Sequence, residues 1–369
     1  MDRLNDEAYM ELALQMAEKS LGQTEVNPVV GCVIVKDGRI VGLGAHLKRG
    51  SHHAEIHALH MAGDEAAGST VYVTLEPCSH QGKTPPCTES LIRAGVRRVV
   101  VATTDPNPRV SGRGIRRLQE AGIEVRTGVL KERAQALNEM YNRFIVRGTP
   151  FVTVKTACTL DGKIAAESGD SRWVSGKEAR EFVHTLRHRH QAIMVGVNTV
   201  IQDDPQLTAR LSVAAIQPVR IVVDSSLRLP ETSRVITDGQ APTWVLTTEK
   251  APKEKVERLR EAGIEVIQCG HGPEVDLKLA MQRLGERGIA SVLVEGGGRL
   301  NGSLLSQRLI DKIIMIIAPK LIGGDEAPLA FRFPGIPKMS EAIRLTQTNV
   351  RMLGGDICIE GYPEYGGER

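Results

Sequence analysis

Aromatic residues are scarce in this chain, at 3% of its 369 positions. Surfaces that bind nucleic acid stack bases on aromatic rings and concentrate Lys and Arg. The formal net charge is only +3, so the composition favours neither feature. We therefore expect no nucleic-acid partner.

Long apolar runs are also missing. A helix that crosses a bilayer needs about 18 consecutive apolar residues, whereas the run from Ile313 to Ala318 has the length of a core strand. The first five residues, Met1-Asp-Arg-Leu-Asn5, begin a polar helix rather than a secretory leader. We therefore expect no membrane association and a cytoplasmic location.

Cysteines are few and lack the regular spacing of a disulfide framework. The six are Cys32, Cys78, Cys87, Cys158, Cys269 and Cys358. Scattered free thiols are typical of a reducing cytoplasm. Only Cys78 and Cys87 lie close together in the sequence, in a loop that follows Glu76-Pro77.

With His53, these two cysteines provide one imidazole and two thiolates. This set suits zinc and leaves a fourth tetrahedral position open for water. Zinc at an open site lowers the pKa of its bound water to about 7. Glu55 is not needed as a ligand and is free to carry a proton from that water to a departing amine. His-x-Glu followed by Pro-Cys is the pattern of zinc deaminases that act on nucleobases.

The predicted elements place these groups together. Residues 71–75 form a buried strand, 88–94 a short helix that ends at Gly95, and His53 begins another helix that ends at Gly63. The positive ends of two helices therefore favour bound thiolate and hydroxide. Two cysteines nine positions apart can also be simple buried side chains. His57 and His60 share a helical face with His53, and we assign them to packing or to supporting the ligands.

The order of predicted elements divides the chain into two α/β units, 1–148 and 149–369. In the first, a helix over 5–20 precedes a hairpin that turns at Asp37-Gly38, a strong hairpin signal. Strands over 71–75, 96–103 and 123–126 and helices over 113–121 and 131–146 follow. Arg147-Gly-Thr-Pro150 breaks the last helix.

The second unit alternates strands with helices, which predicts a largely parallel sheet. We expect strands over 151–155, 192–197, 219–223, 243–247, 264–268, 291–294 and 312–318, and helices over 175–188, 253–262, 275–287 and 299–307.

A glycine run, Glu295-Gly-Gly-Gly298, lies between a predicted strand and a predicted helix. Backbone N–H groups in such a run can close on a phosphate at a helix N-terminus, although a tight turn is the alternative. The chain has no G-x-G-x-x-G fingerprint of the usual dinucleotide fold at this position. Trp173 lies in a Gly/Ser-rich loop, where it can belong to the core or stack on a ligand.

Over nearly its whole length the chain resembles the bifunctional deaminase–reductase family of riboflavin biosynthesis. Residues 1–148 look like its cytidine-deaminase-like domain, an α/β/α domain with a mixed sheet. Residues 149–369 look like its dihydrofolate-reductase-like α/β domain. The most specific similarity is the metal loop, in which eight residues separate Cys78 from Cys87. Many nucleotide deaminases have P-C-x-x-C instead.

The resemblance implies a zinc-dependent deaminase in the first domain. It places the zinc ligands on His53, Cys78 and Cys87 and the proton shuttle on Glu55. It places the pyrimidine and phosphoribosyl pocket on Asn27, His46, His80, Lys83, Asp105 and Asn107.

In the second domain, five segments match the reductase pattern. They are Lys155–Ala165, Ser171–Trp173, Gly196–Pro205, Asp224-Ser225 and Glu295–Gly298. The resemblance implies NADPH contacts at Ala157, Trp173, Thr199, Asp203, Ser225, Gly297, Gly298, Arg299, Leu300, Asn301, Gly302 and Ser303. It implies substrate contacts at Ser171, Arg187, Leu207, Arg210 and Glu295.

The implied chemistry has two steps on a small phosphoribosyl pyrimidine. Hydrolytic deamination of 2,5-diamino-6-(5-phosphoribosylamino)pyrimidin-4-one comes first, and NADPH then reduces the ribosyl group to ribityl. The general acid of the reduction is not evident, and Lys155 and Asp203 are the candidates. We expect a homo-oligomer.

Two other classes of protein remain possible from the sequence. A nucleic-acid editing deaminase, such as a tRNA adenosine deaminase with an unrelated second domain, shares His-x-Glu and Pro-Cys, but it should have P-C-x-x-C and a basic, aromatic face. A binding protein with structural zinc leaves Glu55 unexplained, and structural sites normally have four protein ligands.

Overall fold

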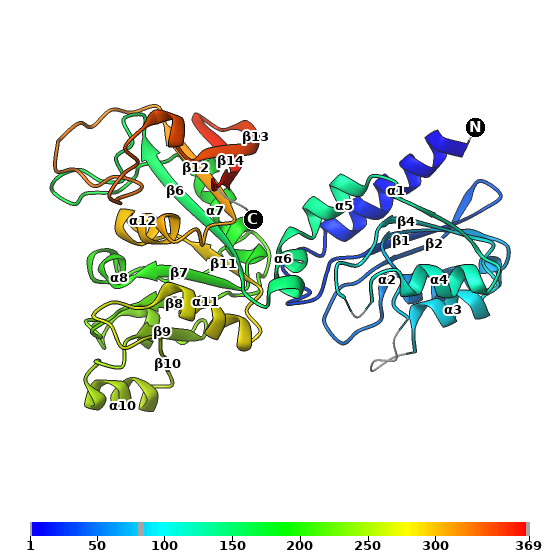
Figure 1. The fold of residues 1–369 in the computed structure, drawn as a ribbon, viewed down its shortest axis with the longest axis horizontal. Helices are drawn as coiled ribbons and strands as arrows, with labels where there is room; N and C mark the ends of the chain where they lie inside the picture. The colour runs from blue at the N-terminus through cyan, green and yellow to red at the C-terminus, as the bar shows by residue number, and fades with distance from the viewer. Residues whose placement is uncertain (1, 80–84, 109, 367–369) are drawn as a thin grey trace. The chain divides into compact units, whose positions relative to one another are not determined.

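The structure is a computed structural model that describes residues 2–79, 85–108 and 110–366 (Figure 1). The chain divides into two compact units, Met1–Gly148 and Thr149–Arg369. The last helix of the first unit ends at Gly148, whose φ of 68° is a left-handed value that glycine adopts without strain.

The first unit contains a mixed sheet with strand order β2-β1-β3-β4-β5. Its strands are β1 (Gly31–Lys36), β2 (Arg39–Ala45), β3 (Thr70–Leu75), β4 (Arg98–Thr103) and β5 (Glu124–Thr127). β1 is antiparallel to both β2 and β3, whereas β3, β4 and β5 are parallel. The β1–β2 hairpin turns at Asp37-Gly38, where both residues have positive φ, as the sequence predicts.

Helices cover both faces of this sheet (Figure 1). They are α1 (Asp2–Glu18), α2 (Ala54–Ala62), the 3₁₀ helix η1 (Gly63–Ala66), α3 (Cys87–Arg93), α4 (Arg113–Glu120), α5 (Lys131–Leu137) and α6 (Glu139–Arg147). Successive strand residues point to opposite faces. Cys32 and Ile34 therefore pack in the cluster of α2, α3 and α4, whereas Val33 and Val35 pack in the cluster of α1 and α5. The expected α/β/α arrangement is confirmed.

Close packing fixes the start of α2 against β2. A Cβ atom at Gly44 would lie 2.0 Å from the carbonyl oxygen of Ala54, and one at Gly42 would lie 2.3 Å from that of Ala58. Neither position can carry a larger side chain without displacing the helix. The glycines of β2 therefore set the position of the α2 N-terminus.

The single helix expected over 131–146 is wrong, because the structure has two helices that meet at Asn138. The buried Asn138 side chain bonds to both backbone groups of Val29, which precedes β1. Its backbone has φ −108° and ψ 23°, outside the helical range. This long-range contact overrides the local helical pattern.

In the second unit, the described residues form a larger sheet with strand order β10-β9-β8-β7-β11-β6-β12-β14-β13. Its strands are β6 (Phe151–Thr159), β7 (Ala192–Gly196), β8 (Val219–Val223), β9 (Thr243–Thr247), β10 (Glu265–Gln268), β11 (Ser291–Val294), β12 (Lys312–Ala318), β13 (Arg344–Leu353) and β14 (Asp356–Glu364). The sheet is parallel from β10 to β12, and β14 and β13 extend it in antiparallel fashion.

The sequence did not predict β13 and β14. Most residues of β13 are exposed, and those of β14 alternate between buried and partly buried. These strands therefore lack the continuous apolar run that marks the parallel strands.

Helices also cover both faces of the second sheet. They are α7 (Lys177–Arg189), α8 (Val197–Asp203), α9 (Arg234–Thr237), α10 (Lys253–Glu261), α11 (Leu277–Glu286) and α12 (Gly298–Ser306), with a 3₁₀ turn η2 (Met339–Glu341). α11 and α12 pack on one face, and α7, α8 and α10 pack on the other. Among the helices that the structure describes, none combines the length and apolar character of a membrane span.

Candidate active sites

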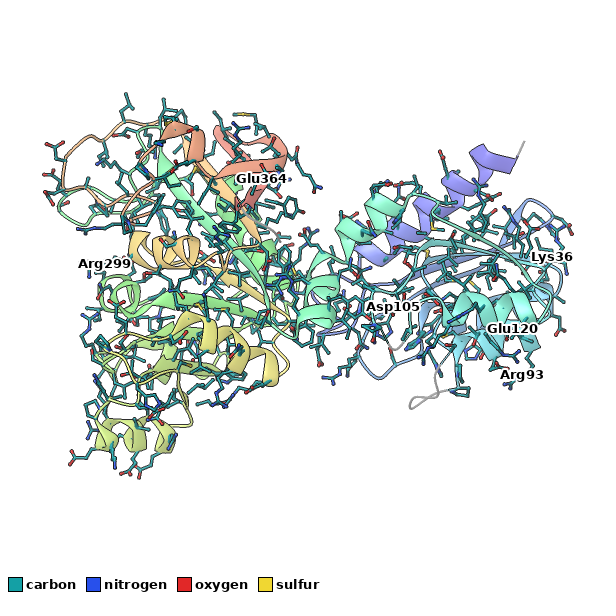
Figure 2. All side chains as sticks on the ribbon, viewed as in Figure 1. Lys36, Arg93, Asp105, Glu120, Arg299 and Glu364 are labelled. Carbon is teal, nitrogen blue, oxygen red and sulfur yellow. The ribbon has the colours of Figure 1, made fainter. Side chains whose placement is uncertain are left out.

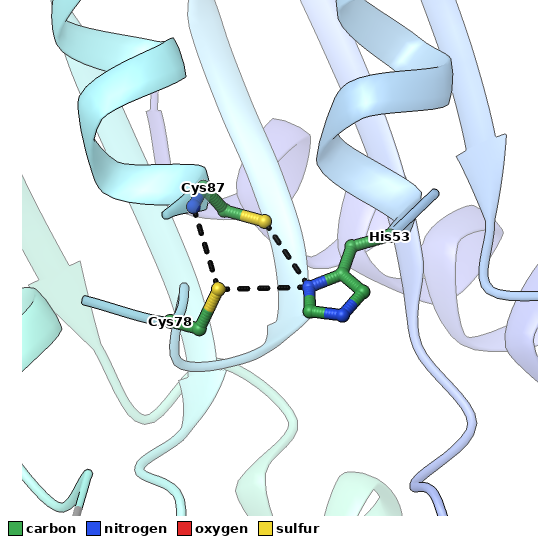
Figure 3. Close-up of side chains that lie close together, drawn as sticks. All are labelled: His53, Cys78 and Cys87. Atoms are coloured by element: carbon green, nitrogen blue, oxygen red, sulfur yellow. Dashed lines mark hydrogen bonds between the residues drawn. The ribbon is translucent and has the colours of Figure 1, made fainter. Parts of the chain in front are cut away.

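His53, Cys78 and Cys87 converge in the first unit (Figure 3). His53 is the N-cap of α2, Cys87 is the first residue of α3, and Cys78 lies in the segment after β3. The His53 Nδ1 atom lies 3.2 Å from Cys87 Sγ and 3.6 Å from Cys78 Sγ. Tetrahedral zinc with its usual bond lengths separates such N and S atoms by about 3.6 Å. The three residues therefore fit one zinc ion.

Within the described part of the chain, no other group of three His, Cys, Asp or Glu side chains brings its ligand atoms within 4.8 Å of one another. The rings of His57 and His60 instead lie edge-on against His52, with centroids 5.7 and 5.4 Å apart. Neither ring belongs to the metal group, and His60 is exposed.

The metal group favours ionised sulfur. A hydrogen bond with Cys87 and the neighbouring His53 lower the pKa of the Cys78 thiol to about 4, against the effect of burial. The same contact with Cys78, together with burial, raises the pKa of Cys87. A thiolate is the form that binds metal, and a dication that binds both sulfurs displaces a proton from the pair.

Glu55 lies in the first turn of α2 and is 3% exposed. Burial and the nearby Cys78 thiolate raise the pKa of its carboxyl to about 7. A group with this pKa can both accept and release a proton near neutral pH. The position and the pKa of Glu55 therefore suit a proton carrier beside the metal group.

A cavity of about 370 Å³ adjoins the metal group. Its lining includes His53, Glu55 and Cys78 and four other predicted site residues, Asn27, His46, Asp105 and Asn107. The structure therefore brings together residues that are up to 80 positions apart in the sequence. The other two predicted residues of this pocket, His80 and Lys83, lie outside the described residues.

His46 fixes the orientation of the Asn27 amide, which lines this cavity. Its Nδ1 lies 3.3 Å from the carbonyl oxygen of His52, and its Nε2 lies 3.2 Å from Nδ2 of Asn27. Nδ1 therefore carries the proton, and Nε2 accepts a hydrogen bond from the amide. Burial lowers the pKa of His46, so the ring stays neutral. The Asn27 amide is thereby fixed at the cavity.

Glu76 has no role that sequence reasoning identified. Its buried carboxylate accepts hydrogen bonds from the backbone N–H groups of Asp105, Gly112 and Gly114, at 3.2, 2.9 and 2.9 Å. The segment that carries Cys78 is thus tied to the loop after β4. The only local signal is the position of Glu76 immediately before Pro77-Cys78.

Tyr141, on α6, was also missed. Its hydroxyl donates a hydrogen bond to Asp105 Oδ1 at 3.0 Å, and it lines the cavity. It belongs to no motif, so nothing in the sequence signals this contact. Together with the backbone N–H of Asn107, which donates to the same oxygen at 2.8 Å, it orients the Asp105 carboxylate.

A cavity of about 690 Å³ lies in the second unit, where β7, β8 and β11 end. Helix α12 begins there at Gly298, and Arg299 on its first turn is exposed (Figure 2). Eight of the residues implied for NADPH line this cavity: Thr199, Asp203, Ser225, Gly297, Gly298, Arg299, Leu300 and Ser303. Both its size and the helix N-terminus suit a phosphate-bearing cofactor.

Asn301 and Gly302 point away from this cavity. The fully buried Asn301 donates a hydrogen bond to the carbonyl oxygen of Ala330 at 2.9 Å. A Cβ atom at Gly302 would lie 2.0 Å from the carbonyl oxygen of Arg332. A helix presents only one face to a ligand. Asn301 and Gly302 therefore pack behind the cavity lining, although they belong to the stretch 297–303 that is implied for NADPH.

A second cavity, of about 300 Å³, shares Ser171, Asp203 and Glu295 with the larger one. The implied residues Ala157, Trp173, Arg187 and Arg210 also line it, together with Lys155. Leu207 lies elsewhere, with its side chain 3% exposed in the core cluster around α8. Sequence reasoning missed Arg180, Val183 and His184, which line this cavity from α7.

Glu295 is the electrostatic centre of the smaller cavity. Its two oxygens accept hydrogen bonds from Nε and Nη2 of Arg187 at 2.7 and 3.0 Å, and Lys155 Nζ lies 3.8 Å away. Burial opposes ionisation, but the charges of Arg187 and Lys155 lower the pKa of Glu295 to about 2. The carboxylate therefore stays ionised.

Trp173 does not belong to the core, because 64% of it is exposed. The guanidinium carbon of Arg180 lies 4.6 Å from its ring centroid. Trp173 lines the smaller cavity instead.

The chain thus joins a zinc-binding deaminase unit to an α/β unit with a cofactor cavity. This combination defines the class of bifunctional deaminase–reductases. Two family models agree with this division. Residues 3–103 match the cytidine and deoxycytidylate deaminase zinc-binding region. Residues 150–359 match the RibD C-terminal domain.

Individual relatives of the chain agree with the two family models. It is 46% identical to riboflavin biosynthesis protein RibD of Bacillus amyloliquefaciens, over 98% of this chain and 97% of that protein. It is 42% identical to RibD of Escherichia coli K12, over 96% and 99%. The solved structure of Acinetobacter baumannii RibD, form 2, matches with a TM-score of 0.89 and 36% identity, over 99% of this chain and 100% of that one.

The chain belongs to the RibD family of riboflavin biosynthesis proteins. It is a bifunctional enzyme, a deaminase and a reductase, with zinc and NADPH as cofactors. The alternative of a nucleic-acid editing deaminase with an unrelated second domain is wrong, because the second unit matches the RibD reductase domain.

Proposed function

We propose that residues 1–148 deaminate 2,5-diamino-6-(5-phosphoribosylamino)pyrimidin-4-one and that residues 149–369 reduce the ribosyl group of the product to ribityl. The convergence of His53, Cys78 and Cys87 beside the buried Glu55 carries this proposal. A Thermotoga maritima structure supports the choice of substrate. The protein in that structure is a diaminohydroxyphosphoribosylaminopyrimidine deaminase/5-amino-6-(5-phosphoribosylamino)uracil reductase. It is 36% identical to this chain and matches it with a TM-score of 0.88, over 98% of this chain and 100% of that one.

In the deaminase reaction, His53, Cys78 and Cys87 would hold the zinc ion, which would act as a Lewis acid and make water nucleophilic near neutral pH. Glu55 accepts a proton from the attacking water and donates it to the amino group, which departs as ammonia. Its carboxyl is buried in the first turn of α2, next to the cavity beside the metal group, where it can make both transfers.

The remaining deaminase residues bind and orient the substrate. Asn27, held by His46, and Asp105, held by Tyr141, line the cavity where the pyrimidine has to lie. Asn107, His80 and Lys83 complete the proposed substrate set. The fixed hydrogen-bonding groups align the reacting carbon with Glu55.

In the reductase reaction, bound NADPH supplies the hydride. We propose that Gly297, Gly298 and the α12 N-terminus bind a cofactor phosphate. The other proposed cofactor contacts are Ala157, Trp173, Thr199, Asp203, Ser225, Arg299, Leu300 and Ser303. The proposed substrate set is Ser171, Arg187, Arg210 and Glu295.

Lys155 is the better placed of the two candidates for the proton donor of the reduction. Its ammonium lies in the smaller cavity, 3.8 Å from Glu295. Burial lowers the pKa of Lys155, against the effect of Glu295, which makes its proton easier to transfer. Asp203 lines both cavities.

We also propose a cytoplasmic homo-oligomer. All six cysteines are free, as is typical of proteins in a reducing compartment. Val350 and Met352 on the edge strand β13 are 62% and 59% exposed. Apolar side chains on an open sheet edge are a surface that a second copy can cover.

The direct test is to incubate the purified chain with the diaminopyrimidine, with and without NADPH. Ammonia should be released in both reactions, and NADPH should be oxidised only as the deaminated product accumulates. Ammonia release from tRNA but not from the diaminopyrimidine would refute the proposal.

A further inference from the structure

Trp173 lies in an irregular segment that leads into helix α7. This segment, residues 171–176, belongs to no helix or strand. It carries two of the proposed reductase contacts, Ser171 for the substrate and Trp173 for NADPH, and both line the smaller cavity. Because regular secondary structure does not fix these two side chains, their positions depend on other contacts.

Burial does not hold Trp173 in place either. The residue is 64% exposed, so its ring gains little from removal of apolar surface from water. The guanidinium of Arg180, 4.6 Å from the ring centroid, is a cation–π contact, which is weak at an exposed site. The position of the ring therefore depends on how the backbone beneath it is held.

Lys320 holds that backbone. Its Nζ donates hydrogen bonds to the carbonyl oxygens of Trp173 and Val174, at 2.9 and 3.2 Å. Hydrogen bonds from a charged donor are stronger than those between neutral groups. One ammonium thus binds two consecutive peptide groups, including that of the proposed cofactor contact.

The next two residues are held in the same manner. Arg180 Nη1 donates to the carbonyl oxygen of Ser175 at 2.7 Å. The backbone N–H of Gly176 donates to Oδ2 of Asp356, the first residue of β14, at 2.6 Å. The end of the segment that joins α7 is therefore fixed independently of Lys320, whereas Trp173 and Val174 depend on the ammonium.

The backbone of Lys320 is itself anchored to the sheet. Lys320 lies two residues after Ala318, the last residue of β12, which is paired with Thr159 at the end of β6. Its carbonyl oxygen accepts a hydrogen bond from the backbone N–H of Leu160 at 2.8 Å. Lys320 therefore connects the irregular segment to the paired ends of two strands.

We propose that Lys320 is a positioning residue of the reductase, which holds Trp173 where its ring contacts bound NADPH. Without the ammonium, the backbone at Trp173 has several positions open to it. A ligand that binds only one of them loses apparent affinity in proportion to the population that is lost. The resemblance to the reductase family implies no role for Lys320. The inference rests on the proposed function, because that function makes Trp173 a cofactor contact.

The experiment is a double-mutant cycle on the dissociation constant of NADPH, measured by calorimetry on the intact chain. Lys320→Met keeps the aliphatic stem and should weaken NADPH binding by about 10-fold, as expected for lost hydrogen bonds from a charged group at an exposed position. Trp173→Ala should weaken it at least as much, because Lys320 acts through this ring. In the Trp173→Ala protein, Lys320→Met should change the constant by less than about twofold. Lys320→Arg keeps a charged donor and should retain binding within about threefold.

Lys163 provides a matched control. Its Nζ also donates to two backbone carbonyl oxygens, those of Gly324 and Ala327, at 2.6 and 3.3 Å. Neither acceptor belongs to the segment 171–176. Lys163→Met removes the same charge and the same kind of bond, so its effect on NADPH binding should be the same factor with and without the Trp173 ring.

A loss of binding in Lys320→Met that is equal with and without the Trp173 ring would overturn the inference, because the ammonium would then attract the cofactor directly or act on the whole fold. Unchanged binding in Lys320→Met, or an effect of Lys163→Met that also depends on the ring, would overturn it too. Trp173→Ala alone separates the two levels of inference. If it binds NADPH like the wild type, the proposed cofactor contact fails. If it binds weakly and Lys320→Met is not coupled to it, only the role of Lys320 fails.

Discussion

The Asn138 side chain bonds to both backbone groups of Val29, as a neighbouring strand would do. Its Oδ1 accepts the Val29 N–H at 2.8 Å, and its Nδ2 donates to the Val29 carbonyl oxygen at 2.9 Å, across 109 positions of sequence. Val29 lies two residues after Asn27 and is 3% exposed. One amide therefore ends helix α5 and anchors the segment that leads to the deaminase cavity.

Asn138→Ala should destabilise the first unit by about 3 kcal/mol, because it leaves two buried backbone groups without partners. Urea unfolding followed by circular dichroism measures the change. Asn142→Ala is the control, since that side chain makes one exposed hydrogen bond, to the carbonyl oxygen of Gln135. It should cost less than about 1 kcal/mol. Equal losses for both variants would show that the Val29 contact is not important.

Cys87→Ser should leave the protein with less than one zinc per chain and without deaminase activity. A serine hydroxyl is a poor replacement for a thiolate ligand, and the remaining His53 and Cys78 make an incomplete site. Metal analysis and ammonia release are the measurements. Cys32→Ala, at a buried cysteine outside the metal group, should keep its zinc. Full zinc and full activity in Cys87→Ser would rule out the assigned centre.

Asp6 should make the first unit sensitive to acid. It is 1% exposed and accepts hydrogen bonds from Arg98, Arg126 and Tyr72. Burial raises the pKa of Asp6. The hydrogen bonds from Arg98 and Tyr72 and the charges of Arg98 and Arg126 have the larger, opposite effect, so the pKa lies below its usual value. The ionised Asp6 therefore contributes its full share to the free energy of unfolding at pH values above its pKa in the unfolded chain, about 4. This contribution is lost as the pH falls through the lower pKa of the folded protein.

Asp6→Asn should accordingly cost about 3 kcal/mol at pH 7, because it leaves Arg98 without its buried partner. The difference from wild type should shrink as the pH falls below about 4. Urea unfolding at a series of pH values tests this. Glu124→Gln removes only the exposed partner of Arg98 and should cost less than about 1 kcal/mol. A difference that is constant down to pH 2 would contradict the argument.

The sequence predicts those parts of the fold and sites that depend on local spacing. His53 and Glu55 are two residues apart, Cys78 follows a proline after a strand, and Asp37-Gly38 turns a hairpin. Each is read from a short window. The number of residues between Cys78 and Cys87 indicated the family.

Contacts between distant segments could not be predicted in this way. Glu76 reaches backbone N–H groups 29 to 39 positions away, and Asn138 breaks a helix for a contact with Val29. His184 lies on an ordinary amphipathic helix, and only the folded chain brings Arg210 beside it. The packing of distant residues decides these positions, so local propensity does not reveal them.

The two activities should be separable by single substitutions, since their residues lie in different units. Glu55→Ala removes the proton carrier but keeps His53, Cys78 and Cys87. Ammonia release should therefore fall by at least about 10²- to 10⁴-fold. Zinc content and NADPH oxidation with the deaminated substrate should stay near wild type.

Asp203→Ala should have the opposite effect. Asp203 lines both reductase cavities, so its loss should weaken NADPH-dependent reduction and spare ammonia release. Both variants are assayed for ammonia and for NADPH absorbance, with each of the two substrates. If Glu55→Ala cannot reduce the deaminated compound, the two reactions share one site. The assignment of one reaction to each unit would then have to be abandoned, whatever the effect of Asp203→Ala.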